Sequence, residues 1–184
     1  MAMMTYYGPA DIARSFVTVR NNTIQVAEEI PEENYDFKAS PDSRSIRQHL
    51  IHIINAPRFQ YHLHAEAKLN NVEGFDFVGF MAPVHAEEEK PYTKAEIVQQ
   101  LRDGKEKLEK WMAGLNEDFL AEIVRFPPPL HPPTKSRFEM IISIKEHEMH
   151  HRGQLMAWLR MIGITPHTTR AREAAVKQLH QQEK

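Results

Sequence analysis

Three histidines lie within five residues in the stretch KEHEMHHRGQLMAWLRMIGITP, which runs from residue 145 to residue 166. If this stretch is helical, His147 and His151 lie about 40° apart around the axis and about 6 Å apart along it. Two imidazoles one turn apart can share one metal ion, each at about 2.0–2.1 Å. His150 lies about 80° from the midpoint of this pair and is a poor third ligand.

The side of the helix that carries His147 and His151 is predicted to face the core. Apolar residues share that side of the helix, namely Met140, Ile144, Leu155 and Trp158. An unpaired polar group in a dry core costs about 1–3 kcal/mol, so buried imidazoles must be hydrogen-bonded or bound to a metal. The spacing of the pair also occurs at zinc sites. From the residues alone, hydrogen bonds to neighbouring groups and metal ligation both stay open.

A third ligand is available in an earlier helical stretch, RQHLIHIINAPRFQYHLH, which carries His49, His52, His62 and His64. His52 has the most apolar neighbours of the four, which predicts that it points inward. His49 is expected to support a ligand or to be exposed, and surface roles are expected for His62 and His64. His52, His147 and His151 would supply three neutral nitrogen ligands and leave one open position, which is the pattern of catalytic rather than structural zinc sites.

A rival interpretation comes from the letters HEMHH, because His147, Glu148 and His151 match the zinc-protease motif HExxH. In that motif Glu148 would be the general base of a hydrolase. Ala157 stands where a third ligand of one such protease class would be, and no strands precede the motif to hold a peptide. The hydrolase interpretation is therefore the weaker alternative.

The elements that must position these histidines are predicted to be long amphipathic helices. Pro9 and Asp11 begin the first, and Pro31 ends it. The second begins at the caps in residues 40–43, is kinked at Pro57 and reaches about Lys68. Capping boxes begin the third at Thr93 and Glu96, and the fourth, which ends near Gly163, at Ser136 and Glu139.

The remaining segments are predicted to be connections. Residues 70–92 are expected to form a long loop with aromatic anchors, the proline-rich residues 126–133 to be irregular, and the chain after Pro166 to form a short last helix. No convincing strand pairing is expected. The fold class is therefore all-α, a four-helix bundle with long connecting loops and a short C-terminal helix.

Composition limits the possible chemistry. The 184 residues suit one domain, and the absence of cysteine excludes disulfides, thiolate metal ligands and a cysteine nucleophile. A net charge of −2 argues against nucleic acid or an anionic membrane as the main partner. No secretory signal and no apolar run of membrane-spanning length is recognised, so a cytoplasmic protein is expected.

The segments SIRQHLIHI and HEMHHRGQLMAWLRMIGITP resemble the DinB/YfiT-like family. The resemblance implies one helical-bundle domain over residues 1–184, with His52, His147 and His151 holding one divalent ion, zinc or nickel being expected. It also implies a metal-dependent enzyme acting on a small molecule, such as a low-molecular-weight thiol S-transferase, and a homodimer. Glu146 stands where many relatives have asparagine, which leaves the groups that support the ligands to be identified.

Two classes of function therefore remain. The first is a metal-dependent enzyme, in which any sulfur nucleophile must come from a cosubstrate. The second is a non-enzymatic metal-binding module that acts as a sensor or interaction protein. Access to the open metal position discriminates between them. No catalytic residue is assigned, although Gln154 could orient a ligand, Glu148 could accept an imidazole N–H, and Arg152 is expected to lie between helices.

Overall fold

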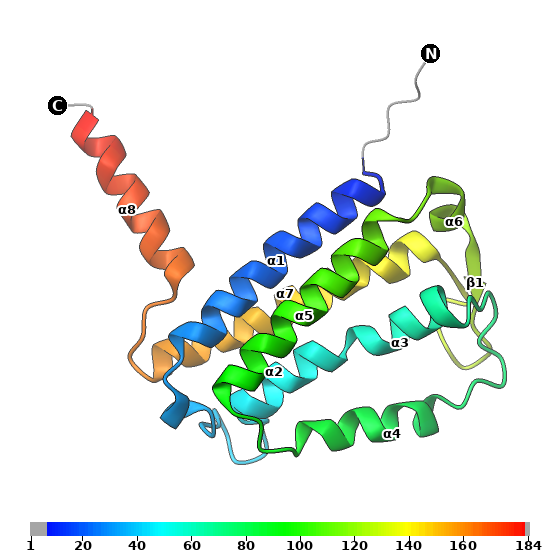
Figure 1. The fold of residues 1–184 in the computed structure, drawn as a ribbon, viewed down its shortest axis with the longest axis horizontal. Coiled ribbons are helices and arrows are strands. Elements are labelled where there is room, and N and C mark those ends of the chain that lie inside the picture. Colours follow the sequence, from blue (N-terminus) through cyan, green and yellow to red (C-terminus); the bar gives the residue numbers. More distant parts are fainter. Residues whose placement is uncertain (1–6, 183–184) are drawn as a thin grey trace.

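The structure is a computed structural model that describes residues 7–182, and it is mostly helical (Figure 1). Its longest helical segments are α1 (Pro9–Glu29), α5 (Lys94–Ala113), α7 (Arg137–Met161) and a run that joins three elements. That run consists of α2 (Ile46–Asn55), α3 (Pro57–Tyr61) and a π-helical turn (His62–Glu66). Helix α1 packs against α5 and α7, and α2 packs against the same two helices. The expectation of a helical fold is confirmed.

Side-chain caps explain where the helices begin. Thr93 accepts a hydrogen bond from the Glu96 backbone N–H at the start of α5, and Ser136 accepts one from Glu139 at the start of α7. Both capping boxes therefore lie where the sequence predicts them. The predicted start of the second helix at residues 40–43 is wrong, because those residues form a turn and Ser45 is the cap. Pro57 separates α2 from α3, as the predicted kink requires.

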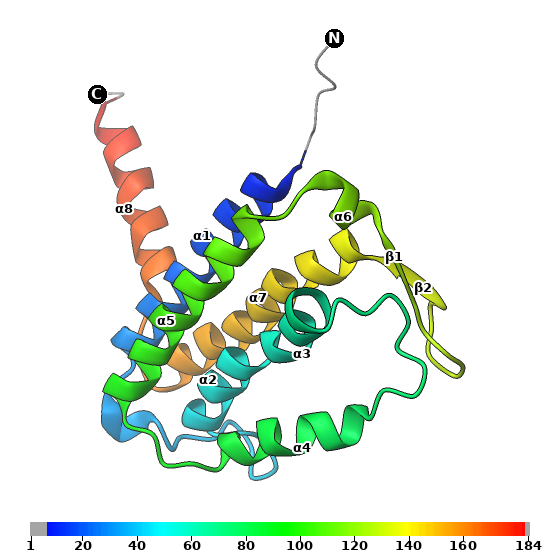
Figure 2. The same ribbon diagram turned by 45° about the vertical axis from the view of Figure 1, so that its right-hand side comes forward.

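The largest correction concerns residues 70–92, where α4 (Phe77–Glu88) replaces much of the predicted loop. Gly79 and Pro83 lie inside this helix and lower its intrinsic propensity. Asp76 caps the helix by accepting the Gly79 N–H at 2.8 Å. Helix α4 packs against α2, so tertiary contacts stabilise a helix that the local sequence does not favour. Figure 2 shows α4 running along the lower edge of the molecule, below α2 and apart from α3.

A short antiparallel strand pair, β1 (Ile123–Arg125) and β2 (Thr134–Ser136), lies at the end of the molecule where α7 begins. The expectation of no strand pairing is therefore wrong for these residues, which are too few to give a clear alternating pattern. The connecting residues 126–133 are irregular, as their prolines predict. A short helix, α6 (Glu117–Ala121), precedes β1, and a 3-10 turn (Glu32–Asn34) follows α1.

The last helix, α8 (His167–Gln182), is directed away from the other helices in both views (Figures 1 and 2). Its first residue is tied to the end of α1, because the His167 backbone N–H donates to Glu29 Oε2 at 3.1 Å. Gly163, with φ of 84°, lies just after the end of α7 in a conformation that favours glycine. None of the described helices is both long and apolar enough to cross a membrane.

The core beside the histidines is formed by aliphatic side chains of α2, α5 and α7. Leu50 and Ile53 of α2 pack in one cluster with Leu155 and Leu159 of α7, and Trp158 packs against this cluster from a half-buried position. These contacts hold α2 and α7 side by side. Since each helix presents its histidines next to its core residues, the packing fixes the relative positions of the imidazoles.

Candidate metal centre

The structure brings together the imidazoles of His52 on α2 and of His147 and His151 on α7. His147 Nε2 lies 3.3 Å from His52 Nε2 and 3.1 Å from His151 Nε2. One nitrogen of each ring lies within 4.8 Å of the others, and all three side chains are partly buried. The convergence expected from the sequence is therefore present, between His52 and a residue 95 positions later in the chain.

The partners of the other ring nitrogens indicate which nitrogens carry protons. His52 Nδ1 lies 2.8 Å from Glu88 Oε1, and His151 Nδ1 lies 2.9 Å from Gln154 Oε1. A carboxylate or amide oxygen can only accept, so each Nδ1 is the donor in these two contacts. His49 Nε2 also lies 3.1 Å from His151 Nδ1, so in this assignment the His49 proton is directed to the His151 backbone oxygen instead. The Nε2 atoms of neutral His52 and His151 are therefore unprotonated, and their lone pairs face His147.

With neutral rings, the three Nε2 atoms that face one another do not carry enough protons to form a hydrogen bond across each contact. If His147 Nε2 carries a proton, it can donate to His52 or to His151 but not fully to both. A cation bound by all three nitrogens would satisfy every lone pair. Tetrahedral coordination with metal–nitrogen bonds of about 2.0–2.1 Å places ligand nitrogens about 3.3–3.4 Å apart. The two separations from His147 Nε2, 3.1 and 3.3 Å, are close to this value, and all three ligand nitrogens lie within 4.8 Å of one another.

Burial keeps the late pair of histidines neutral near pH 7. Burial, and then the neighbouring His151, lower the pKa of His147 to about 4. Burial is also the main cause of the lowered pKa of His151, while its hydrogen bond to Gln154 opposes the shift. A neutral imidazole is the form that binds metal ions. The environment therefore favours ligation over protonation.

Glu88, on the last turn of α4, supports His52 and was missed by the sequence analysis. Its two carboxylate oxygens have different partners: Oε1 accepts from His52 Nδ1 and Oε2 accepts from Arg44 Nε at 2.6 Å. Burial raises the pKa of Glu88, but the hydrogen bonds from His52 and Arg44 outweigh it and lower the pKa overall. Carboxylates that hold the second nitrogen of a ligand histidine orient the ring and increase its basicity.

His49 is buried beside the site, so the alternative of an exposed position is excluded. Its Nε2 lies 3.2 Å from the His151 backbone oxygen, to which it can donate, and its ring packs edge-on against Trp158. Burial, and then His151, lower the pKa of His49 to about 3. His49 therefore positions α7 from α2 as a neutral donor.

Glu148 does not support a histidine and is not free to act as a general base. Its carboxylate accepts from Arg20 Nε at 2.8 and 3.0 Å, and both side chains are buried. Arg152 lies between helices as expected, because its Nη1 donates to the Val19 backbone oxygen. The ion pair links α1 to α7, which removes the basis of the HExxH hydrolase interpretation.

Two of the remaining histidines behave as expected and one does not. His150 is exposed, and His62 is partly exposed and paired with Glu66. His64 is buried, with 1% of its surface exposed, so the predicted surface role is wrong. Arg137, 73 residues later in the chain, donates to its Nδ1 at 2.9 Å, and no local sequence signal reveals that partner.

An open polar cavity of about 560 Å³ reaches the histidine cluster from outside. Its lining includes His49, His151 and Gln154 of the site, together with Glu88 and Arg44. A site sealed by a fourth protein ligand would support a purely structural role. Here the cavity leads to His151, so small molecules can approach the cluster.

Comparisons with known proteins agree with the geometry. A sequence model described as the DinB superfamily matches residues 15–155, which include all three clustered histidines. No curated protein sequence matches significantly. Among solved structures, a DinB-like protein from Bacillus subtilis superposes with a TM-score of 0.61 and 22% sequence identity, covering 84% of this chain and 93% of that chain. At this identity the likeness concerns the fold.

Proposed function

Because the chain belongs to the DinB superfamily, we propose that it is a metal-dependent enzyme in which His52, His147 and His151 hold one divalent ion. The observation that carries the proposal is the convergence of three Nε2 atoms, two of them unprotonated because Glu88 and Gln154 occupy the opposite ring nitrogens. Zinc or nickel suits three imidazoles, and the donor set alone does not choose between them.

The proposed reaction class is transfer of a low-molecular-weight thiol to an electrophile. A bound divalent ion would act as a Lewis acid that lowers the pKa of a coordinated thiol. The protein has no cysteine, so the sulfur must come from a cosubstrate. The polar cavity lined by His151 and Gln154 supports entry of such a molecule. In this proposal Glu88 and His49 keep the rings oriented, and Gln154 fixes the tautomer of His151.

Metal analysis of purified protein tests the ligand assignment. We expect about one divalent ion per chain in the parent and loss of most of it in His151→Ala. His150→Ala, at an exposed neighbouring position, is the matched control and should keep its metal. Glu88→Gln should weaken metal affinity by about 10–100-fold, because a supporting carboxylate is lost. Equal metal in His151→Ala and parent would refute the assignment.

The alternative is a non-enzymatic metal-binding module, and a panel of thiols and electrophilic acceptors separates the two. Metal-loaded parent should consume thiol faster than His151→Ala at equal protein concentration. If the metal is retained but no thiol in the panel reacts faster than in buffer, the transferase proposal fails and the module is favoured. The ligand assignment would survive that result, because metal content measures it independently.

The remaining features of the proposal concern organisation. We infer that α1, α2–α3, α5 and α7 form a four-helix bundle, because the contacts of α1 and α2 with α5 and α7 close a ring. We also propose one domain over residues 1–184, a homodimer, and a small molecule rather than nucleic acid or membrane as the partner. The net charge of −2 supports the last point.

A further inference from the structure

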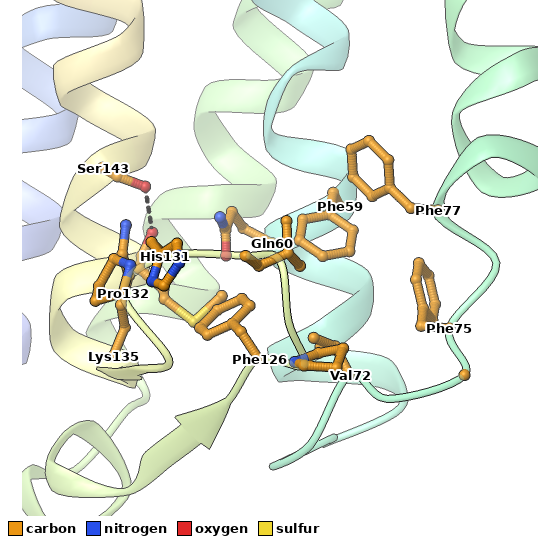
Figure 3. Close-up of a pocket in the computed structure, with 14 residues that line it drawn as sticks. Phe59, Gln60, Val72, Phe75, Phe77, Phe126, His131, Pro132, Lys135 and Ser143 are labelled. Carbon is orange, nitrogen blue, oxygen red and sulfur yellow. Dashed lines mark hydrogen bonds between the residues drawn. The ribbon is translucent and has the colours of Figure 1, made fainter.

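A second cavity, of about 430 Å³, lies where α3, α7 and the residues flanking the strand pair meet (Figure 3). Its volume falls within the usual range of small-molecule sites, about 300–1,000 Å³. Most of its lining is aromatic or aliphatic, including Phe59, Phe75, Phe77, Phe126, Val72 and Met140. Such a lining favours a ligand with an aromatic or branched apolar body.

The polar groups of this cavity are few. Figure 3 shows His131, Lys135 and Ser143 on one side and Phe59, Phe75 and Phe77 on the other. The lining contains no aspartate or glutamate, and none of the ion pairs among residues 7–182 involves Lys135. Lys135 is half-buried on β2. Its ammonium group is therefore a cation beside an apolar cavity, with no carboxylate of the described residues within ion-pair distance.

Gln60 contributes a hydrogen-bond donor whose orientation is set by a chain of partners that includes the buried side chains of His64 and Arg137. Glu122 accepts from Arg137 Nε at 2.8 Å, and Arg137 Nη1 donates to His64 Nδ1 at 2.9 Å. Because a guanidinium can only donate, the proton of neutral His64 is on Nε2, which donates to Gln60 Oε1 at 3.1 Å. Gln60 lines the cavity, so its amide N–H groups are left for an acceptor oxygen of a ligand.

The apolar cavity lies close to the histidine cluster. Ser143 lines the cavity and precedes His147 by four residues, which is about 6 Å along α7. Helix α4 spans the distance between the two places, because Phe77 at its start lines the cavity and Glu88, about 16 Å further along the helix, binds His52. The Ser143 side of the cavity is therefore the part that lies nearest the proposed metal position.

We propose that this cavity binds a small apolar carboxylic acid. Its apolar body packs against the phenylalanine side chains, its carboxylate pairs with Lys135, and the Gln60 amide donates to an acceptor oxygen. We further propose that this acid is the molecule acted on at the histidine cluster, a part that rests on the proposed function. Charge complementarity favours an acid, because Lys135 carries the only ammonium, guanidinium or carboxylate charge among the described residues of the lining.

Calorimetric titration of the full chain in the presence of a chelator tests binding without any metal. The probes are 4-phenylbutyrate and its uncharged analogue 4-phenylbutyramide. The parent should bind the acid about tenfold more tightly than the amide, since a charge-assisted pair adds to apolar contacts they share. Lys135→Met should abolish that difference and leave the affinity for the amide unchanged. Lys145→Met, on α7 outside the cavity, is the matched control and should behave like the parent.

A second variant addresses the cavity itself. Ser143→Leu adds bulk to the lining and should weaken both probes at least tenfold. Equal affinity of the parent for acid and amide, an unchanged preference in Lys135→Met, or no binding of either probe would overturn the proposal. These results do not depend on metal content, so they leave the ligand assignment untouched. Conversely, if the protein were found to bind no metal, the expected titration results would stay the same, because the titrations are done with a chelator present.

A separate measurement tests whether the bound acid lies beside the metal held by the histidine cluster. The ¹⁹F resonance of 4-(4-fluorophenyl)butyrate should be broadened by Co²⁺-loaded parent much more than by Zn²⁺-loaded parent, because only Co²⁺ is paramagnetic. Lys135→Met loaded with Co²⁺ should broaden it less at the same ligand concentration. Equal line widths with Co²⁺ and Zn²⁺ at saturating ligand would refute placement beside the metal while the carboxylate site itself stands.

Discussion

Replacing Glu148 by glutamine should destabilise the protein strongly without removing a catalytic base. The side chains of Arg20 and Glu148 are 1% and 2% exposed, and Arg20 Nε is 2.8 Å from the nearer carboxylate oxygen. Removing one partner of a buried ion pair leaves an uncompensated charge and costs about 3–5 kcal/mol. That is a large part of the about 5–15 kcal/mol by which a typical native domain is stable.

Urea unfolding followed by circular dichroism measures this loss. In thermal unfolding, at about 2–4 °C per kcal/mol for a chain of this size, the melting temperature of Glu148→Gln should fall by about 6–20 °C. Glu146→Gln, two residues earlier and exposed, is the matched control and should change stability by less than about 0.5 kcal/mol.

A double variant tests whether the unpaired charge of Arg20, and not another effect of the substitution, causes the loss of stability in Glu148→Gln. Arg20→Met combined with Glu148→Leu replaces both charges by apolar groups and should recover most of the loss, since such replacements are often close to neutral. A loss below about 1 kcal/mol in Glu148→Gln would refute the reasoning. So would a double variant as unstable as the single one, because the buried arginine would then not be the cause.

Two further predictions concern stability. Ser136→Ala removes the cap of α7 and should cost about 1 kcal/mol in urea unfolding; an unchanged midpoint would contradict the capping role of the Ser136–Glu139 box. Burial, and then Arg137, lower the pKa of His64 to about 3, so ¹⁵N NMR should show a neutral ring protonated at Nε2 at pH 5. Since unfolded histidine has a pKa of about 6.5, His64 lowers the free energy of unfolding by up to about 1.4 kcal/mol per unit as pH falls from 6.5 toward 3. A positively charged His64 at pH 5 would contradict this.

Local signals predicted the existence of the four long helical segments and the spacing of the late histidine pair. The capping boxes at Thr93 and Ser136 depend on residues three positions apart, so they are visible in the sequence. His147 and His151 are four residues apart on one helix, which fixes their relative position. The convergence of His52 on this pair was expected from its apolar neighbours, and the structure places it there.

The features that sequence analysis missed depend on partners far apart in the chain. Glu88 was overlooked because glycine and proline obscured the helix that carries it. The burial of His64 requires Arg137, and the pairing of Glu148 requires Arg20, which is 128 residues away. Partners that are distant in the sequence form hydrogen bonds or ion pairs with these buried polar side chains. The local hydrophobic pattern gives no sign of those partners. The supporting groups of the site are therefore harder to predict than the clustered histidines themselves.

Helix α4 contacts both the apolar cavity and a proposed metal ligand, and this connection has a thermodynamic consequence. Its first residue, Phe77, lines the apolar cavity, and its last, Glu88, holds the ring of His52. An organic acid that shifts this helix on binding must change the affinity for the ion, and the ion must then change the affinity for the acid by the same factor. Titrating each component with and without the other would give this coupling free energy from two independent directions.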